Sequence, residues 1–334
     1  MAESIMSTTA TRSLRRAGLL WAVALLVVAV AAIALPAFRS PISVNSLLAT
    51  LAPILLISIG QALTVLYGGI DLSVGATAGL ATVVLALHPL LPGGAAVALP
   101  LALVAGLVVG VLNGTGVVLG VNPLLMTFAM SGVVQGAALL LQDAPGAEAP
   151  FDLIRILATP LGPVPLMAVV ALVALIAVWW WISQSRTGRV VLAAGYDRRS
   201  ATRLGLPLTR TTLLVFALSG LLSAAGGVAI ATRTFTADAL VGSSSVIDSI
   251  ATVLVAGIVV TGGIGSVLSV LPAAVIIAVV GQIITLTGTD PYYQTIFTGV
   301  LLIVAVGVYN LAGARIRVPW RLGRPALDRK KDDE

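Results

Sequence analysis

One carboxylate stands in a glycine-rich break between two apolar stretches. The break contains Gly68, Gly69 and Gly75, with Asp71 and Ser73 between them. Glycine lets the backbone leave helical geometry, and an ionisable group in apolar surroundings is costly unless it is paired or hydrogen-bonded. Two interpretations are open. Asp71 could organise a gate in a broken helix by accepting backbone N–H bonds where the next helix starts, or it could be an ordinary cap in a tight turn.

A second set of polar side chains lies inside apolar stretches. Such groups could hydrogen-bond a hydroxylated solute in a central pathway, or they could join neighbouring helices. The predicted pathway-lining candidates are Gln61, Asn113, Asn122, Thr127 and Gln135, and Gln282 is a further polar residue of this kind. Asp248 follows three serines at an expected helix start, where a capping role and a solute contact are both open.

Catalytic and metal-binding patterns are missing from the sequence. There is no cysteine and one histidine, so thiolate chemistry and a histidine metal cluster are excluded. No Gly-x-Ser-x-Gly elbow, His-Glu-x-x-His pair or GxxxxGK[ST] phosphate loop occurs. The chain is therefore not expected to be an enzyme, to carry a cofactor or to hydrolyse ATP by a P-loop.

The composition identifies the elements that must position these residues. Of 334 residues, 58% are hydrophobic and 10% charged, far from the average soluble domain. Stretches long enough to cross a bilayer lie near 17–36, 47–67, 72–90, 95–119, 124–142, 164–183, 211–231, 247–262, 266–288 and 293–312. We therefore expect an all-α, polytopic membrane protein with about ten spans. Its predicted parts are a tail at 1–16, a transmembrane domain at 17–312 and a basic tail at 313–334. The first span alone could also be a signal peptide.

The basic residues predict the orientation of the spans. With residues 1–16 in the cytoplasm, the three cytoplasmic segments 1–16, 184–210 and 313–334 contain 3, 6 and 7 of the 19 Lys and Arg residues. Only three arginines fall outside: Arg39, Arg155 and Arg233. This bias predicts that both termini are cytoplasmic, and it explains the basic clusters without a nucleic acid partner. The long internal segment 184–210 could contain a short surface helix at 200–205.

Several motifs occur together in a recognisable order. They are GQALTV at 60–65, GGIDLSVG at 68–75, LNG at 112–114, VNPLLMT at 121–127, TGRVVLAAG at 187–195, SGLLSAAGG at 219–227 and GGIGSVL at 262–268. In combination they closely resemble the permease subunits of bacterial ABC importers of the ribose, xylose and galactoside type, within the branched-chain amino acid and sugar permease superfamily. The chain departs from that pattern at 196–200, where the family usually has Asn-Pro-Glu, and at Ile264, where it usually has Arg.

The resemblance implies a function and a set of partners. It implies a multi-pass subunit of the bacterial inner membrane that imports a monosaccharide or related polyol. Implied partners are ABC ATPase subunits carrying ATP and Mg²⁺, a periplasmic sugar-binding protein, and a second permease, identical or related. It also implies that an ATPase-coupling loop contains Thr187, Gly188, Arg189, Gly195, Ala201, Leu204 and Gly205. The alternatives are an ion-coupled secondary transporter, which should have more charges within its spans, and an intramembrane hydrolase, which lacks its catalytic groups.

Overall fold

The structure, a computed structural model, describes residues 2–161, 164–290 and 292–313 and is almost entirely helical. The helices are α1 (Ala2–Ala34), α2 (Pro41–Leu66), α3 (Val74–Ala86), α4 (Ala95–Val118), α5 (Pro123–Leu141), α6 (Phe151–Ala158), α7 (Leu166–Gln184), α8 (Arg186–Tyr196), α9 (Arg198–Arg203), α10 (Leu208–Thr234), α11 (Ser243–Val255), α12 (Val270–Thr287) and α13 (Tyr292–Gly313). Short 3-10 helices lie at Pro36–Arg39, His88–Leu90 and Val267–Ser269. The predicted all-α class is confirmed.

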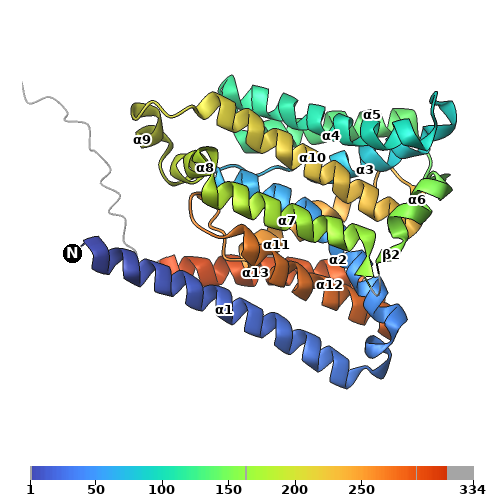
Figure 1. Cartoon of the computed structure of the whole chain (residues 1–334), viewed down its shortest axis with the longest axis horizontal. Coiled ribbons are helices and arrows are strands. Elements are labelled where there is room, and N and C mark those ends of the chain that lie inside the picture. Colours follow the sequence, from blue (N-terminus) through green and yellow to red (C-terminus); the bar gives the residue numbers. More distant parts are fainter. Residues whose placement is uncertain (1, 162–163, 291, 314–334) are drawn as a thin grey trace, which may run out of the picture.

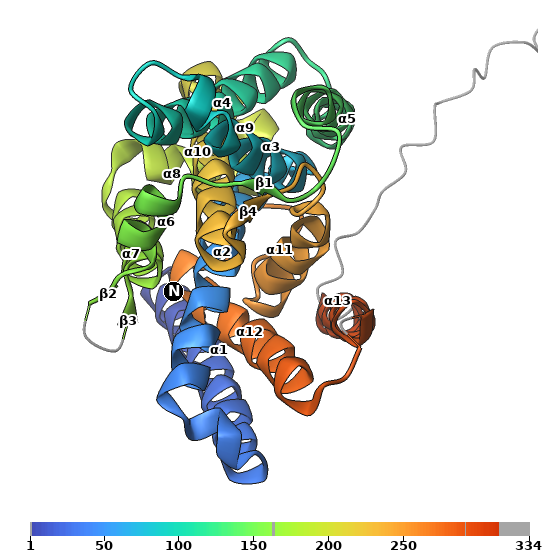
Figure 2. The same cartoon turned by 90° about the vertical axis from the view of Figure 1, so that its right-hand side faces the viewer.

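The long helices run side by side along one axis of the molecule (Figure 1). At one end lie α8, α9 and the start of α1, and we call this the α8 end. At the opposite end, the β1 end, strand β1 (Ala147–Glu148) pairs antiparallel with β4 (Thr236–Ala237), and α6 lies beside them (Figure 2). Strands β2 (Pro160–Leu161) and β3 (Val164–Pro165) form a second small antiparallel pair. The strands therefore only tie the ends of helices together.

Six helices among the described residues are long and apolar enough to cross a bilayer. They are α2, α4, α5, α7, α10 and the helix Val267–Thr287 that includes α12. Four shorter apolar helical segments are Gly18–Ala34 of α1, α3, α11 and Tyr292–Gly307 of α13. The chain is thus an all-α membrane protein with several spans.

Helices α3 and α11 are shorter than the sequence predicts. We expected spans near 72–90 and 247–262, but each helix has 13 residues, which corresponds to about 20 Å of the roughly 30 Å hydrocarbon core. Irregular glycine-containing segments replace the missing turns, 67–73 before α3 and 256–266 after α11. Non-helical backbone at membrane depth is tolerated where protein buries it, so these two segments need partners inside the fold.

Helix α10 lies at the centre of the bundle and packs against α2, α3 and α4. The approach is close because small residues face one another. A side chain at Gly106 or Gly110 of α4 would overlap the backbone of α10 at Gly220 or Phe216. Such small-residue interfaces let helices approach in lipid, where the hydrophobic effect between helices is weak.

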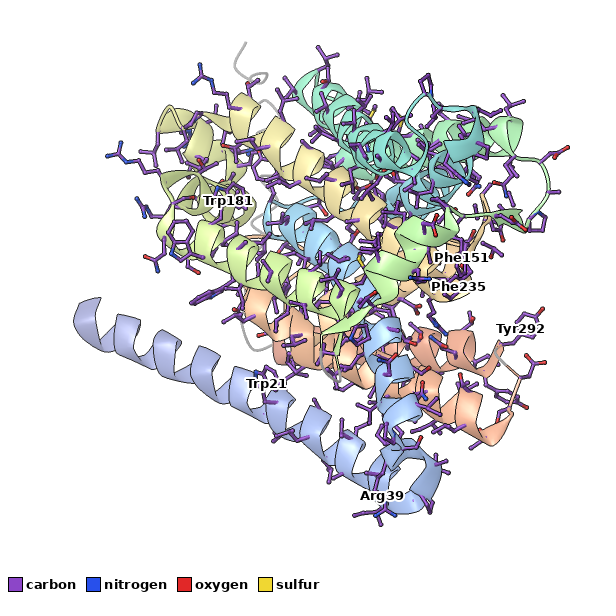
Figure 3. All side chains as sticks on the ribbon, turned by 45° about the vertical axis from the view of Figure 1, so that its right-hand side comes forward. Trp21, Arg39, Phe151, Trp181, Phe235 and Tyr292 are labelled. Carbon is purple, nitrogen blue, oxygen red and sulfur yellow. The ribbon has the colours of Figure 1, made fainter. Side chains whose placement is uncertain are left out.

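The outer helices present large apolar side chains to the surroundings. Ile33 of α1, Leu140 of α5 and Ile303 of α13 are exposed. Figure 3 shows side chains covering the outside of the bundle, with Trp21 on α1. This apolar exterior fits a lipid environment.

The 184–210 segment is more helical than predicted. We expected one short helix at 200–205, whereas α8 and α9 cover most of the segment and α9 ends at Arg203. Ser185 caps α8 by accepting a hydrogen bond from the Gly188 amide at 2.9 Å. The sequence prediction missed α8 because its apolar face is short and lies beside arginines.

Candidate functional site

Asp71 lies at the centre of a buried hydrogen-bond network in the break between α2 and α3. One carboxylate oxygen accepts from the Ser73 amide at 2.9 Å and the Ser73 hydroxyl at 2.7 Å. The other oxygen accepts from the Ser219 hydroxyl of α10 at 2.8 Å. The Asn113 amide of α4 donates to the Ser73 hydroxyl at 2.8 Å. Asp71 is 1% exposed, so its carboxylate bonds within the protein rather than to solvent: it joins the break to α10, and the Ser73 hydroxyl joins it to α4.

Asp71 makes the local capping bond that the sequence predicted as one of its two roles, and it also contacts a distant helix. The residue at the N-cap position of α3 is Ser73, whose own side chain makes no capping bond. Asp71, two residues earlier, accepts the Ser73 amide and also reaches across to α10. The turn is a local cap with a long-range anchor, and a gating role for it stays a prediction.

Thr127 of α5 satisfies the irregular backbone of the same break. Its hydroxyl accepts from the Leu72 amide at 3.0 Å and lies 3.1 Å from the Ile70 carbonyl, to which it can donate. Thr127 is fully buried. A peptide N–H without a partner in this position would cost about 1–3 kcal/mol, so Thr127 provides part of the support that the non-helical segment requires.

Three backbone segments meet at the α8 end: one at Gly68, one at Gly195, and one at Gly262 and Gly263. We call these four residues the glycine junction. The Gly263 amide donates to the Leu66 carbonyl at the end of α2, at 2.8 Å. A methyl group on Gly195 would overlap both this carbonyl and the Gly263 nitrogen. Gly68, Gly262 and Gly263 have positive φ values of 91°, 91° and 73°, which favour glycine. The end of α8 thus contacts both irregular segments at once.

Tyr67 adds a second link at the α8 end. Its hydroxyl lies 2.7 Å from the Thr212 hydroxyl and donates to the Leu208 carbonyl, so it ties α2 to the start of α10. The Arg198 guanidinium lies over its ring, 5.3 Å from the centroid. The sequence analysis missed Tyr67, and only its position beside the glycine break could have drawn attention to it.

Asp197 begins α9, where the chain departs from the family's Asn-Pro-Glu pattern. Its carboxylate accepts from the amides of Arg199 and Ser200 and from the Ser200 hydroxyl at 2.6 Å. The hydrogen bonds from Ser200 lower the pKa of Asp197, so the cap is charged at neutral pH. The chain therefore has a helix cap at the place where it lacks the Asn-Pro-Glu motif.

The predicted coupling-loop residues divide into two groups. Gly188, Gly195 and Ala201 are buried against the rest of the bundle, while Arg189, Leu204 and Gly205 are exposed and Thr187 is half-buried. Leu204 is 76% exposed. In this conformation only the exposed group can meet a partner directly, and Gly195 faces the glycine junction instead.

The predicted pathway residues do not gather around one cavity. Gln61 is fully buried, and both polar atoms of its amide lack a hydrogen-bond partner among the residues that the structure describes. Asn113 belongs to the Asp71 network, Asn122 caps α5 through the Leu124 amide, and Gln135 donates to the Ala239 carbonyl at 2.6 Å. Gln282 bonds to Ser43 and Ser46 of α2, as expected of a residue that joins helices. Pathway lining stays a prediction for all of them.

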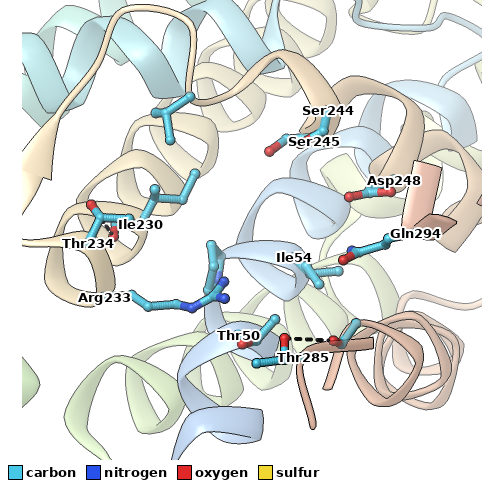
Figure 4. A pocket seen from close by; sticks show the side chains of 13 residues that line it. Thr50, Ile54, Ile230, Arg233, Thr234, Ser244, Ser245, Asp248, Thr285 and Gln294 are labelled. Carbon is cyan, nitrogen blue, oxygen red and sulfur yellow. Dashed lines mark hydrogen bonds between the residues drawn. The ribbon is translucent and has the colours of Figure 1, made fainter. Parts of the chain in front are cut away.

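A polar cavity of about 420 Å³ opens toward the β1 end, between α2, α10, α11, α12 and α13. Its polar lining consists of Thr50, Arg233, Thr234, Ser244, Ser245, Asp248, Thr285 and Gln294. Figure 4 shows Arg233 on one side and Asp248 with Gln294 on the other. Of these, the sequence analysis named Asp248 as an open candidate and treated Arg233 only as a topology signal.

No group of three or more His, Cys, Asp or Glu side chains that could hold a metal ion occurs in the part of the chain that the structure describes. The candidate site therefore consists of a hydrogen-bonded break, a glycine junction and a polar cavity. Among the described residues, these features include no activated nucleophile.

Comparison of the sequence with known proteins identifies the family of the chain. Residues 43–306 match the family described as branched-chain amino acid transport system / permease component. The chain is 30% identical to the galactose/methyl galactoside import permease protein MglC of Escherichia coli, over 84% of this chain and 90% of that protein. It is 29% identical to the ribose import permease protein RbsC of Bacillus subtilis, over 81% and 85%. It is also 29% identical to the autoinducer 2 import system permease protein LsrD of Yersinia enterocolitica, over 75% and 78%. These relatives are transport permeases and not enzymes, and the chain belongs to the family of permease components of the branched-chain amino acid transport type.

Proposed function

We propose that the chain is the membrane-spanning permease subunit of an ATP-driven importer for a monosaccharide or related polyol. The observation that carries this proposal is the match over most of the chain to import permeases named for galactose and ribose. The polar cavity and the buried break give such a permease a place for a hydroxylated solute and an element that can open. The same geometry offers no catalytic group.

We further propose that the partners supply energy and substrate. The sequence has no phosphate loop, so ATP and Mg²⁺ belong to ABC ATPase subunits. The exposed side chains of Arg189 and Leu204 form the surface for this contact, because they project from the α8 end beside the glycine junction. A periplasmic sugar-binding protein docks at the β1 end. A second permease, identical or related, completes the pore.

The proposed topology places all ten apolar helices across the bacterial inner membrane. The α8 end then faces the cytoplasm, as the 16 basic residues of segments 1–16, 184–210 and 313–334 favour. Most of the last segment lies outside the described residues, so this part of the proposal rests on sequence. The β1 end faces the periplasm, where the binding protein delivers its sugar.

Reconstitution tests the proposal directly. The purified chain is placed in liposomes alone, with an ion gradient, or with the ATPase and binding protein encoded beside it. We expect uptake of a radiolabelled sugar from a panel of D-ribose, D-galactose and D-allose only in the complete system with ATP. Uptake by the chain alone under an ion gradient would identify a secondary transporter and contradict the proposal.

A further inference from the structure

The cavity at the β1 end is built from donors and acceptors on opposite walls. Arg233 of α10 presents a guanidinium, which only donates hydrogen bonds. Asp248 of α11 and Gln294 of α13 present acceptor oxygens from the other side (Figure 4). Figure 4 draws no hydrogen bond between Arg233 and Asp248, which lie on opposite walls of the cavity. Donors and acceptors opposed in this way suit a ligand that lies between them.

The remaining lining suits a compact polyhydroxylated molecule. Thr50, Ser245 and Thr285 add hydroxyl groups from three different helices. Pro53 and Ile54 of α2 also line the cavity, and apolar side chains there can pack against the C–H face of a sugar ring. The volume of about 420 Å³ falls within the range of about 300–1,000 Å³ found for small-molecule pockets. We propose that this cavity is a polyol-binding site of the permease itself, in which Arg233, Asp248 and Gln294 hold the solute.

Helix α2 extends the polar face of this cavity toward the α8 end. Thr50 and Ile54 line the cavity, and Ser58 and Gln61 follow at helical spacing on the same face. Both are fully buried, and the Ser58 hydroxyl and both atoms of the Gln61 amide lack partners among the described residues. A buried polar group without a partner is costly, and an ordinary helix contact would avoid that cost. These groups gain partners when the solute, or water with it, moves inward from the cavity.

The opposed charges could also hold the carboxylate and ammonium groups of an amino acid. The Thr50 and Thr285 hydroxyls already donate to the Ser46 and Gly281 carbonyls and offer their oxygens as acceptors. Together with Ser245 and the Gln294 amide they favour the polyol, because an amino acid with an apolar side chain would leave these donors and acceptors in the cavity unused. An unpaired polar group in a site strongly disfavours the wrong ligand. The inference rests on the proposed import function and adds that selectivity lies partly in the permease.

Direct binding tests this inference separately from transport. The full-length chain in lipid nanodiscs is titrated with D-ribose, D-galactose, D-allose and L-leucine by saturation-transfer NMR. We expect binding of the sugar that the complete importer transports, with a Kd on the order of 1 mM, because a site on a pathway must release its ligand. Asp248→Asn and Arg233→Gln are expected to weaken it at least tenfold. The matched control Arg155→Ala removes an exposed arginine of α6 at the same end and is expected to leave binding unchanged.

Uptake by the complete importer separates the outcomes. With saturating binding protein, Asp248→Asn and Arg233→Gln are expected to lower sugar uptake at least fivefold without loss of the ATPase in a pull-down. If the importer transports sugar but the chain binds none, or if both variants bind and transport as the parent does, the cavity is not a polyol site and the import function stands. Binding and uptake of leucine in place of the sugars would overturn the inference together with the proposed sugar import.

Discussion

Replacing Asp71 with alanine is the most informative single change in the break. The variant loses three hydrogen bonds, from the Ser73 amide, the Ser73 hydroxyl and the Ser219 hydroxyl. Net contributions are about 0.5–1.5 kcal/mol for a bond in a folded protein and average about 0.6 kcal/mol between membrane helices. Three lost bonds therefore predict a fall of about 1.5–4.5 kcal/mol in the free energy of unfolding. The orphaned donors lie in a site that is closed to water, so the upper half of this range is expected.

Asp71→Asn separates the hydrogen bonds from the charge. The amide oxygen can still accept from both donors of Ser73, and the Ser219 hydroxyl can rotate to accept from the new amide nitrogen. We expect the stability of this variant to lie within about 1 kcal/mol of the parent. If transport nevertheless falls at least tenfold, the charge of Asp71 acts in gating. Unchanged transport would assign the residue to structure alone.

The assay is unfolding of the purified chain by titration with sodium dodecyl sulfate in mixed micelles, followed by circular dichroism. ATPase pull-down and sugar uptake are measured on the same preparations. Asp152→Ala removes an exposed carboxylate of α6 and serves as the control, with no change expected in the unfolding midpoint. If Asp71→Ala unfolds at the same midpoint as this control, the network does not support the break and the reasoning from its geometry fails.

Three further predictions concern the junction, the break and the topology. Gly195→Ala is expected to displace the ends of α2 and α8 and to reduce uptake at least tenfold, although no exposed surface changes. The control Gly132→Ala, where a methyl group meets open space, is expected to leave uptake unchanged. Equal uptake by both variants would show that the ends of α2 and α8 can move apart without loss of transport. Thr127→Val leaves the Leu72 amide unpaired and is expected to lower the free energy of unfolding by about 1–3 kcal/mol in the same assay. The control Thr127→Ser retains the hydrogen bond. Equal losses of stability in both variants would exclude this hydrogen bond as the cause. Ser200→Cys in this cysteine-free chain is expected to resist an impermeant thiol reagent in intact cells and to react after the membrane is opened. Labelling in intact cells would contradict the proposed orientation.

The glycine junction connects the predicted coupling segment to the end of α2 and to the irregular segment after α11. A partner that moves α8 also moves Gly195, which cannot yield without displacing Leu66 of α2 and Gly263 after α11. Tyr67 and Arg198 connect the start of α9 to the same end of α2. Because the contacts of Gly195 with Leu66 and Gly263 are close backbone approaches, we infer that a small displacement of α8 would be transmitted rather than absorbed by flexible side chains.

The sequence by itself determined the features that depend on local composition. Apolar stretches of about 20 residues, basic clusters and the glycines around Asp71 are properties of neighbouring residues, so they predicted the helical class, the membrane environment and the position of the break.

The tertiary structure alone decided which groups meet. Asp71 and Ser219 are 148 residues apart, and neither residue's neighbours identify the other as its partner. Gly195 was recognisable as a glycine in a motif, but its role depends on the carbonyl of Leu66 against which it packs. Likewise, Arg233 looked like a topology signal until the packing of α10 and α11 against α2 placed it opposite Asp248. Hydrophobicity is set residue by residue along the chain, whereas pairing between distant polar groups is set by the way that helices pack.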